Sequence, residues 1–323
     1  MAPHRRSDFT ITQPPALDVL RYSKLAYIAQ SQHLYGIYSM LPDRHLWRYD
    51  NYESIPVPAE DDPGGLHAYG LELYEACLRD LTAAVLGLAW KARECTAVSV
   101  QALNQRRLSA SAAAARAAFE AATAAIDHVV RLQKTRRQYR MSKDFGALIQ
   151  RLDESSTRGL WGRKGVTEGD IKANHFLKHQ ESVLKFAGPA HEEIQEWHPV
   201  VYDMLCNMTH PSADGHQQFW HLPKGPPPVS GAPVWIEMSS EPDLRPAYLQ
   251  RQLKCVLWAL GWSCAHSVRA YDLCVEEQRD FDAMPTNSEN PAALTPVANL
   301  RYDAQDRQTS CSTCLGQRGA PAT

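Results

Sequence analysis

Apolar residues recur along most of this chain at intervals of three and four, the spacing that gathers side chains on one face of an α-helix. The first run predicts a helix over about 15–40, and Pro14 and Pro15 suit its first turn. A second run starts at Leu66 and extends beyond Cys95. Long helices are therefore expected in the first third of the chain.

The clearest helical pattern lies within residues 109–143, where alanines hold most of the apolar positions. Small side chains let a neighbouring helix approach closely, so this seam is expected to be a contact between helices. A last strong helix is predicted over 249–274, a shorter one ends at 186, and another runs over 199–210. The alanine-rich seam consists of Ala112, Ala115, Phe119, Ala122, Ile126 and Val129.

Turn-forming residues separate these segments and set the expected domain organisation. Residues 1–64 are predicted to form an N-terminal helix and loop, 65–280 the main helical bundle, and 281–323 a disordered tail. The glycine-rich stretch 153–170 is expected to be a loop, and 211–246 an irregular loop packed through its aromatic residues. The predicted fold is all-α, a bundle of five to six helices.

Composition excludes a global attraction to polyanions or membranes. The 323 residues are 44% hydrophobic and carry a formal charge of -2, so a nucleic-acid contact would have to be a local patch. No apolar run reaches the roughly 18–20 residues that span a bilayer, and no secretory signal is seen. We expect a cytoplasmic protein without membrane contact, whose six cysteines between 77 and 274 are buried free thiols.

The segment YDMLCNMTHPSADGHQQFW (202–220) joins a helix end to several polar side chains. The apolar and polar residues of its helix fall on opposite sides of a 100° wheel, and the simplest interpretation is that the polar strip faces water. The apolar side consists of Val201, Leu205 and Met208, and the polar strip of Asp203, Asn207 and His210.

Two short motifs carry a family resemblance. They are Tyr-x-x-Leu-x4-His-Pro-Ser, formed by Tyr202, Leu205, His210, Pro211 and Ser212, and Arg-x-x-x-Glu, formed by Arg116 and Glu120. Together they resemble a family of largely uncharacterised bacterial helical proteins that is distantly similar to the HEPN superfamily, the higher eukaryote and prokaryote nucleotide-binding domains. The resemblance covers about residues 66–212. It implies a helical bundle, often dimeric, with many RNA-cleaving toxins and defence effectors among its relatives.

The chain departs from the active members of that superfamily. In them an arginine stands five to seven residues before a histidine, so that both groups project from one helix end toward the phosphate. Here Asp203, Met204 and Leu205 occupy those positions before His210, and no other histidine has an arginine there. An aspartate would repel a scissile phosphate. Catalysis by His210 would therefore need Arg116 from another helix or a different chemistry, and no enzyme activity of the usual HEPN type is expected.

Arg116 and Glu120 have two interpretations. Four residues apart on a helix, they can form an exposed ion pair worth about 0.3–0.5 kcal/mol. If the alanine seam is buried, Glu120 can instead hold His210 in one tautomer. We predict that His210 turns toward Arg116 and Glu120, so that these three candidate catalytic residues have a structural role.

A metal site is a further hypothesis, because histidines and acids are dense in one region. Their spacing contains no HExxH or ExxH pattern, and Cys311 and Cys314 form only half of a zinc-type ligand set. No metal and no cofactor are therefore expected. The residues concerned are His191, Glu192, Glu193, His198, Asp203, His210, Asp214, His216 and His221.

The stretch RLQKTRRQYRMSK (131–143) gives the best argument for a polyanionic partner. No acid lies between Asp127 and Asp144, and a tyrosine among the cations offers a stacking surface. The alternative is that the cations gather because the dipole at a helix C-terminus favours them. The candidate nucleic-acid-binding residues are Arg131, Lys134, Arg136, Arg137, Tyr139, Arg140 and Lys143.

The sequence is compatible with three functions. The leading hypothesis is a diverged, non-catalytic HEPN-like module that binds or regulates, with RNA or another polyanion at 131–143, in bacterial stress or phage defence. The second is a diverged ribonuclease or metal-dependent hydrolase that uses His210. The third is a scaffold that forms a homo-oligomer through its helical seams.

Overall fold

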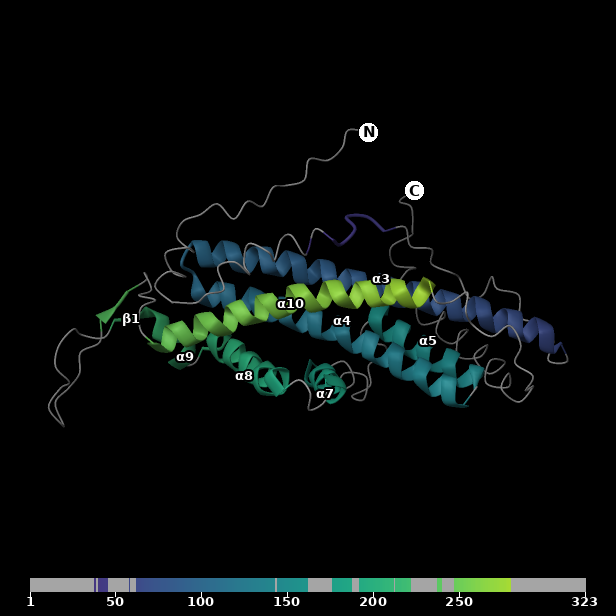
Figure 1. The fold of residues 1–323 in the computed structure, drawn as a ribbon. Coiled ribbons are helices and arrows are strands. Elements are labelled where there is room, and N and C mark those ends of the chain that lie inside the picture. Colours follow the sequence, from purple (N-terminus) through teal and green to yellow (C-terminus); the bar gives the residue numbers. More distant parts are fainter. Residues whose placement is uncertain are drawn as a thin grey trace, which may run out of the picture. The chain divides into compact units, whose positions relative to one another are not determined.

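The computed structural model describes residues 38, 40–45, 58, 62–142, 144–161, 176–187, 192–211, 213–221, 237–239 and 247–279. The architecture of this part is all-α, as predicted, and its longer helices are shown in Figure 1. These are α3 (Pro63–Asn104), α4 (Leu108–Ser142), α5 (Phe145–Trp161), α7 (Phe176–Ala187), α8 (Glu192–Thr209) and α10 (Ala247–Arg279). The short elements are α9 (Ala213–His216), η3 (Gln217–Phe219), β1 (Trp220–His221) and β2 (Glu237–Met238).

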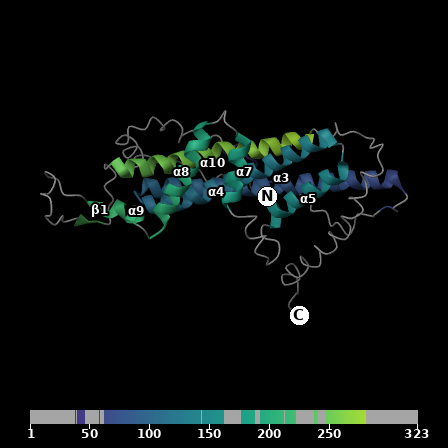
Figure 2. The ribbon, with the colours of Figure 1, turned by 90° about the horizontal axis from the view of Figure 1, so that it is seen from below.

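The described residues fall into two compact units that share the long helices. Unit 1 lies within 1–42, 86–126 and 179–269, and unit 2 within 43–85, 127–178 and 270–323. Inside each unit, segments of α3, α4 and α10 lie side by side, which two perpendicular views show (Figure 1, Figure 2). Both units are therefore built on the same three helices.

Unit 2 has an aromatic-rich core between α3, α4 and α5. Gly70 of α3 allows Phe145 to approach so closely that a Cβ added at Gly70 would lie 2.7 Å from the ring. Near the end of α10, the Gln278 amide donates to the Thr82 hydroxyl of α3 at 2.9 Å. The core cluster contains Tyr69, Leu73, Tyr74, Cys77, Leu78, Leu81, Leu132, Tyr139, Phe145, Leu148, Ile149 and Leu152.

Unit 1 is organised around the alanine-rich part of α4. Ala112, Ala115 and Ala122 are fully buried, as the apolar pattern predicts, because they face other helices of the same chain. The Phe119 ring on the same seam packs 6.0 Å, centroid to centroid, from the Trp258 ring of α10. The seam is thus occupied within one chain, and a homo-oligomer would have to use a different surface.

Both ends of α3 have well-defined caps. The helix begins at Pro63, earlier than expected, because Asp62 caps it: the Gly65 amide donates to Asp62 Oδ1 at 2.9 Å. At the other end Arg106 adopts a positive φ of 57°, and the Arg107 amide donates to the Ala102 carbonyl at 2.8 Å. This is a Schellman-type termination, in which an arginine occupies the position that usually favours glycine.

Two boundary predictions were wrong. The stretch 153–170 was expected to be a loop, but α5 continues to Trp161, and Gly159 is packed so closely that an added Cβ would lie 2.8 Å from the Ala84 side chain. The helix expected to start at Pro199 begins at Glu192, so that Pro199 lies inside α8. In α5, tertiary packing outweighs the local turn signal of the glycines. In α8, the helix tolerates the proline.

Several predictions concern residues outside the described part. Of the helix expected over 15–40, only Tyr38 and Met40 are described, and none of the tail over 281–323 is described. Within 211–246 the described residues form α9, η3 and an antiparallel pair in which Trp220 is opposite Met238.

The cysteines of the described helices are free thiols, as predicted. Cys77, Cys255, Cys264 and Cys274 are buried, whereas Cys95 and Cys206 are half-buried. Burial raises the pKa of Cys255 to about 11 and that of Cys264 to about 12, so these two thiols stay protonated at neutral pH. Across the described ranges, none of the helices is sufficiently long and apolar to traverse a bilayer.

Candidate functional site

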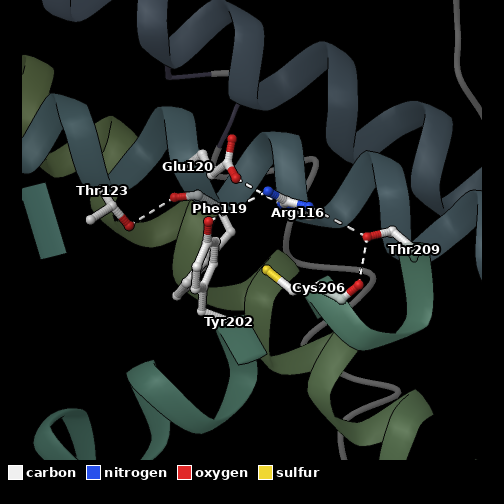
Figure 3. A network of polar contacts seen from close by, with 7 residues as sticks. All are labelled: Arg116, Phe119, Glu120, Thr123, Tyr202, Cys206 and Thr209. Atoms are coloured by element: carbon white, nitrogen blue, oxygen red, sulfur yellow. Dashed lines mark hydrogen bonds and ion pairs between the residues drawn. The ribbon is translucent and has the colours of Figure 1, made fainter. Parts of the chain in front are cut away.

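Arg116 lies at the centre of a polar cluster between α4 and α8 (Figure 3). Its Nε donates to Glu120 Oε1 at 2.8 Å, so the ion pair within α4, one of the two interpretations of these residues, is present. Its Nη1 reaches Thr209 Oγ1 at 3.4 Å and its Nη2 reaches the Tyr202 hydroxyl at 3.5 Å. The guanidinium also lies 5.5 Å from the centroid of the Tyr202 ring. Three of the residues that carry the family resemblance are therefore in contact.

The electrostatics of this cluster favour a structural role, in which Arg116 connects α4 to α8. The Arg116 and Glu120 side chains are 30% and 35% exposed, so solvent screens their attraction. The pair therefore contributes little to the free energy of unfolding. Burial, followed by the neighbouring Cys206 and Glu120, raises the pKa of Tyr202 to about 12. The phenol is therefore uncharged at neutral pH and can act as a hydrogen-bond acceptor for Arg116.

The predicted contact of His210 with Glu120 is wrong. His210 is exposed, and in the described part of the chain no hydrogen bond joins its ring to Arg116 or Glu120. Thr209 takes that place, because its hydroxyl donates to the Cys206 carbonyl at 2.9 Å and meets Arg116. Gly215 of α9 covers the carbonyl end of α8, where an added Cβ would lie 2.5 Å from the His210 carbonyl oxygen.

The polar strip of α8 otherwise follows the sequence prediction. Asp203 and Asn207 are exposed together with His210, whereas Val201 and Leu205 are fully buried. Pro211 is exposed as well, and Ser212 lies outside the described residues. The simplest interpretation of the segment, a strip that faces water, is therefore confirmed for α8.

The structure removes several residues from the predicted basic patch. Arg131 Nε donates to Asp127 Oδ2 at 2.8 Å, and Arg136 is buried in an ion pair with Glu277 of α10. Tyr139 is 9% exposed and packs against Phe145, so it offers no stacking surface. The sequence could not show this, because α5 and α10 supply the covering side chains. Lys143 lies outside the described residues.

The remaining cations form what we call the basic face: Lys134, Arg137 and Arg140 of α4 with Arg151 of α5. All four are exposed, and Arg151 is brought beside α4 by a hydrogen bond to Gln138. The three on α4 recur every third residue, so they form a slanting strip that is about 9 Å long and winds about 120° around the helix. Every exposed residue of α4 over 134–142 is basic or uncharged.

A buried histidine was not predicted as an organising residue. His198 is fully buried, and the Gln180 amide nitrogen lies 2.9 Å from its Nδ1. Because an amide nitrogen only donates, Nδ1 is the acceptor and Nε2 carries the proton, which points to Thr123 Oγ1 at 3.2 Å. The Thr123 hydroxyl in turn donates to the Phe119 carbonyl at 2.8 Å. Burial, and then the nearby His266, lower the pKa of His198 to about 3.

His198 was one of nine residues considered for a metal site. Among the described residues, no group of three or more His, Cys, Asp or Glu side chains is placed to hold a metal ion. His191 itself lies outside the described part. The hydrogen bonds of His198 to Gln180 and Thr123 account for both of its ring nitrogens.

Three aromatic side chains of α10 form a row of rings beside His198. Trp262 stacks on Trp258 at 5.5 Å and on His266 at 3.6 Å, with interplanar angles of 11° and 19°. The Lys254 Nζ lies over the Trp197 ring of α8, 4.3 Å from the ring centroid. The four-residue spacing of Lys254, Trp258, Trp262 and His266 is the sequence signal that would have predicted this row.

Comparison with known proteins adds no assignment: the chain matches no family model, no curated protein and no solved structure. Function is therefore inferred from the residues and their geometry.

Proposed function

We propose that this chain is a non-catalytic, HEPN-like helical module of the cytoplasm that binds RNA through the basic face. The observation that carries the proposal is the composition of the exposed surface of α4 over 134–142, which holds three cations and no acid. Along α5 the next exposed residue after Arg151 is Glu154, so the cationic surface is limited on that side. A phosphate backbone is the partner that such a strip attracts without base recognition.

The dipole explanation of these cations accounts for less. A helix C-terminus favours positive charge only within its last turn, and Lys134 and Arg137 lie more than one turn from the end of α4 at Ser142. Within the described part of the chain, no acid pairs with them in the way that Asp127 pairs with Arg131 and Glu277 pairs with Arg136. Their exposure therefore leaves them available to a ligand.

The test is the affinity for single-stranded RNA of a variant in which Lys134, Arg137 and Arg140 are replaced by glutamine. Three to four phosphate contacts predict that log K falls with log salt concentration with a slope of about -2 to -3, since each contact contributes about 0.7. The variant should bind at least about tenfold more weakly at low salt and show a slope closer to zero. Glutamine keeps helix propensity, so its melting temperature should stay near that of the wild type.

The matched control replaces three exposed lysines elsewhere, Lys91, Lys178 and Lys185, with glutamine. It changes the net charge equally, and it should bind RNA nearly as well as the wild type. Equal losses in both triple variants would show a general charge effect and would contradict the proposed face.

A second candidate function, a diverged ribonuclease, is favoured by one observation. The Arg116 guanidinium reaches Thr209, and the exposed His210 follows directly in the chain. A cation from α4 could then take the role that a same-helix arginine has in active HEPN proteins. Cleavage of single-stranded RNA that disappears in His210→Ala, with an unchanged melting temperature, would support this candidate. Wild-type protein without any cleavage would dismiss it.

A further inference from the structure

The row of rings on α10 ends in Trp258, which is partly exposed to solvent. Trp262 is 6% exposed and is enclosed by Trp258, His266 and the edge-on His198 ring at 4.9 Å. Trp258, one turn earlier, is half-exposed. Its orientation is fixed by the nearly parallel stack on Trp262 and by the Phe119 ring, which meets it edge-on at 6.0 Å. The outer end of the row is thus a rigid aromatic surface that solvent can reach.

Cations accompany this aromatic surface. Arg251 is exposed and Lys254 half-exposed on the same side of α10 as Trp258, since positions 251, 254 and 258 are three and four residues apart. The Lys254 ammonium lies over the half-exposed Trp197 ring of α8. From Ala247 to Tyr271, α10 contains no acidic residue. The exposed acid next to Trp197, Glu196, projects about 100° away from it around α8.

We infer that Trp197 and Trp258, with Arg251 and Lys254, form a base-stacking contact for single-stranded RNA in unit 1. A nucleobase would stack on the Trp197 ring in the place that the Lys254 ammonium occupies in the free protein. Lys254 and Arg251 would then contact the adjoining phosphates. Every base has a π-face, so the contact would be tolerant of sequence.

The chemistry favours RNA over an apolar protein segment. An apolar partner would have to bury Arg251 and Lys254 next to the rings without a counter-charge, which is costly. A nucleotide supplies a ring and an anion together. The inference rests on the proposed RNA-binding function but concerns other residues: the basic face contacts only the backbone, because Tyr139 is buried, whereas this contact responds to bases.

The experiment compares two ligands, an oligouridylate and an inorganic polyphosphate of similar charge, for binding to the full-length chain. Trp197→Leu should weaken oligouridylate binding about tenfold, in line with the loss of one stacked base, and leave polyphosphate binding nearly unchanged. Trp90→Leu is the control, because Trp90 is also half-buried in unit 1 but its indole donates to the Pro42 carbonyl at 2.9 Å. That variant should bind both ligands as the wild type does.

A second measurement covers the case in which Trp197→Leu folds poorly. Oligouridylate should quench the tryptophan fluorescence of the wild type, polyphosphate should not, and most of the quenching should be lost in Trp258→Phe. Unchanged oligouridylate affinity in a folded Trp197→Leu, or quenching that polyphosphate reproduces, overturns the inference while the basic face stands. Failure of both ligands to bind the wild type would instead overturn the proposed function itself.

Discussion

At the scale of single residues, the glycines of α3 show how a neighbour decides the effect of one methyl group. Gly70 faces Phe145, and a Cβ there would lie 2.7 Å from the ring and 3.2 Å from Ile149 Cδ1. Gly87, on the same helix, is exposed, and apart from its chain neighbours and the backbone of its own helix no described heavy atom lies within 4 Å of the position its Cβ would take. The same substitution should therefore have opposite effects at the two sites.

We predict that Gly87→Ala raises the free energy of unfolding by roughly 0.5–1 kcal/mol, because glycine in a helix costs that much relative to alanine. Gly70→Ala should lower it by about 1–3 kcal/mol, because the aromatic core of unit 2 must shift. Urea unfolding monitored by circular dichroism measures both. A stabilising Gly70→Ala would mean that Phe145 moves aside without cost.

At the scale of the elements, the helix stripes of α3, α4 and α10 could be predicted because each buries one face, and that periodicity is local. The extent of α5 could not, since Ser155 and Ser156 are buried and Gly159 meets Ala84 only after packing. The candidate site divides in the same way. The ion pair of Arg116 and Glu120 follows from their spacing, but its partners on α8 depend on how two distant helices meet.

An ion pair between Arg136 and Glu277 joins α4 to α10 in unit 2. The Arg136 and Glu277 side chains are 10% and 16% exposed, so each charge is largely withdrawn from water and relies on the other. Arg136→Met should lower the free energy of unfolding by about 3–5 kcal/mol, because Glu277 remains as a nearly buried charge without its partner.

The double variant Arg136→Met, Glu277→Leu should recover most of that loss, since an apolar pair of similar volume avoids the cost of desolvation. A double-mutant cycle by chemical unfolding measures the coupling. Strictly additive losses would show that the two side chains act independently. Arg131, whose Asp127 partner is buried but which is itself 34% exposed, provides a comparison with a half-screened pair.

At the scale of the whole molecule, acid should destabilise the fold through its buried histidines. His198 faces Gln180 of α7, Thr123 of α4 and His266 of α10, and none of these can neutralise an imidazolium. Its folded-state pKa of about 3 lies below the usual 6.5, and burial lowers the pKa of His266 as well. Between about pH 6.5 and pH 3, the unfolded chain therefore binds a proton at His198 that the folded chain does not bind.

The sign of the effect follows directly. A histidine whose pKa is lowered on folding contributes its full stability above about pH 6.5, and this stability declines as the pH falls toward 3. We predict that the free energy of unfolding decreases by up to about 1.4 kcal/mol per pH unit for His198 alone over this window. In His198→Gln the slope between pH 6 and 4 should be smaller by about that amount, because glutamine does not titrate. Parallel stability curves for the wild type and His198→Gln would show that His198 is protonated in the folded chain.

Nitrogen-15 spectra of the imidazoles test the same point without a substitution, since a neutral ring protonated at Nε2 should persist for His198 at pH 5.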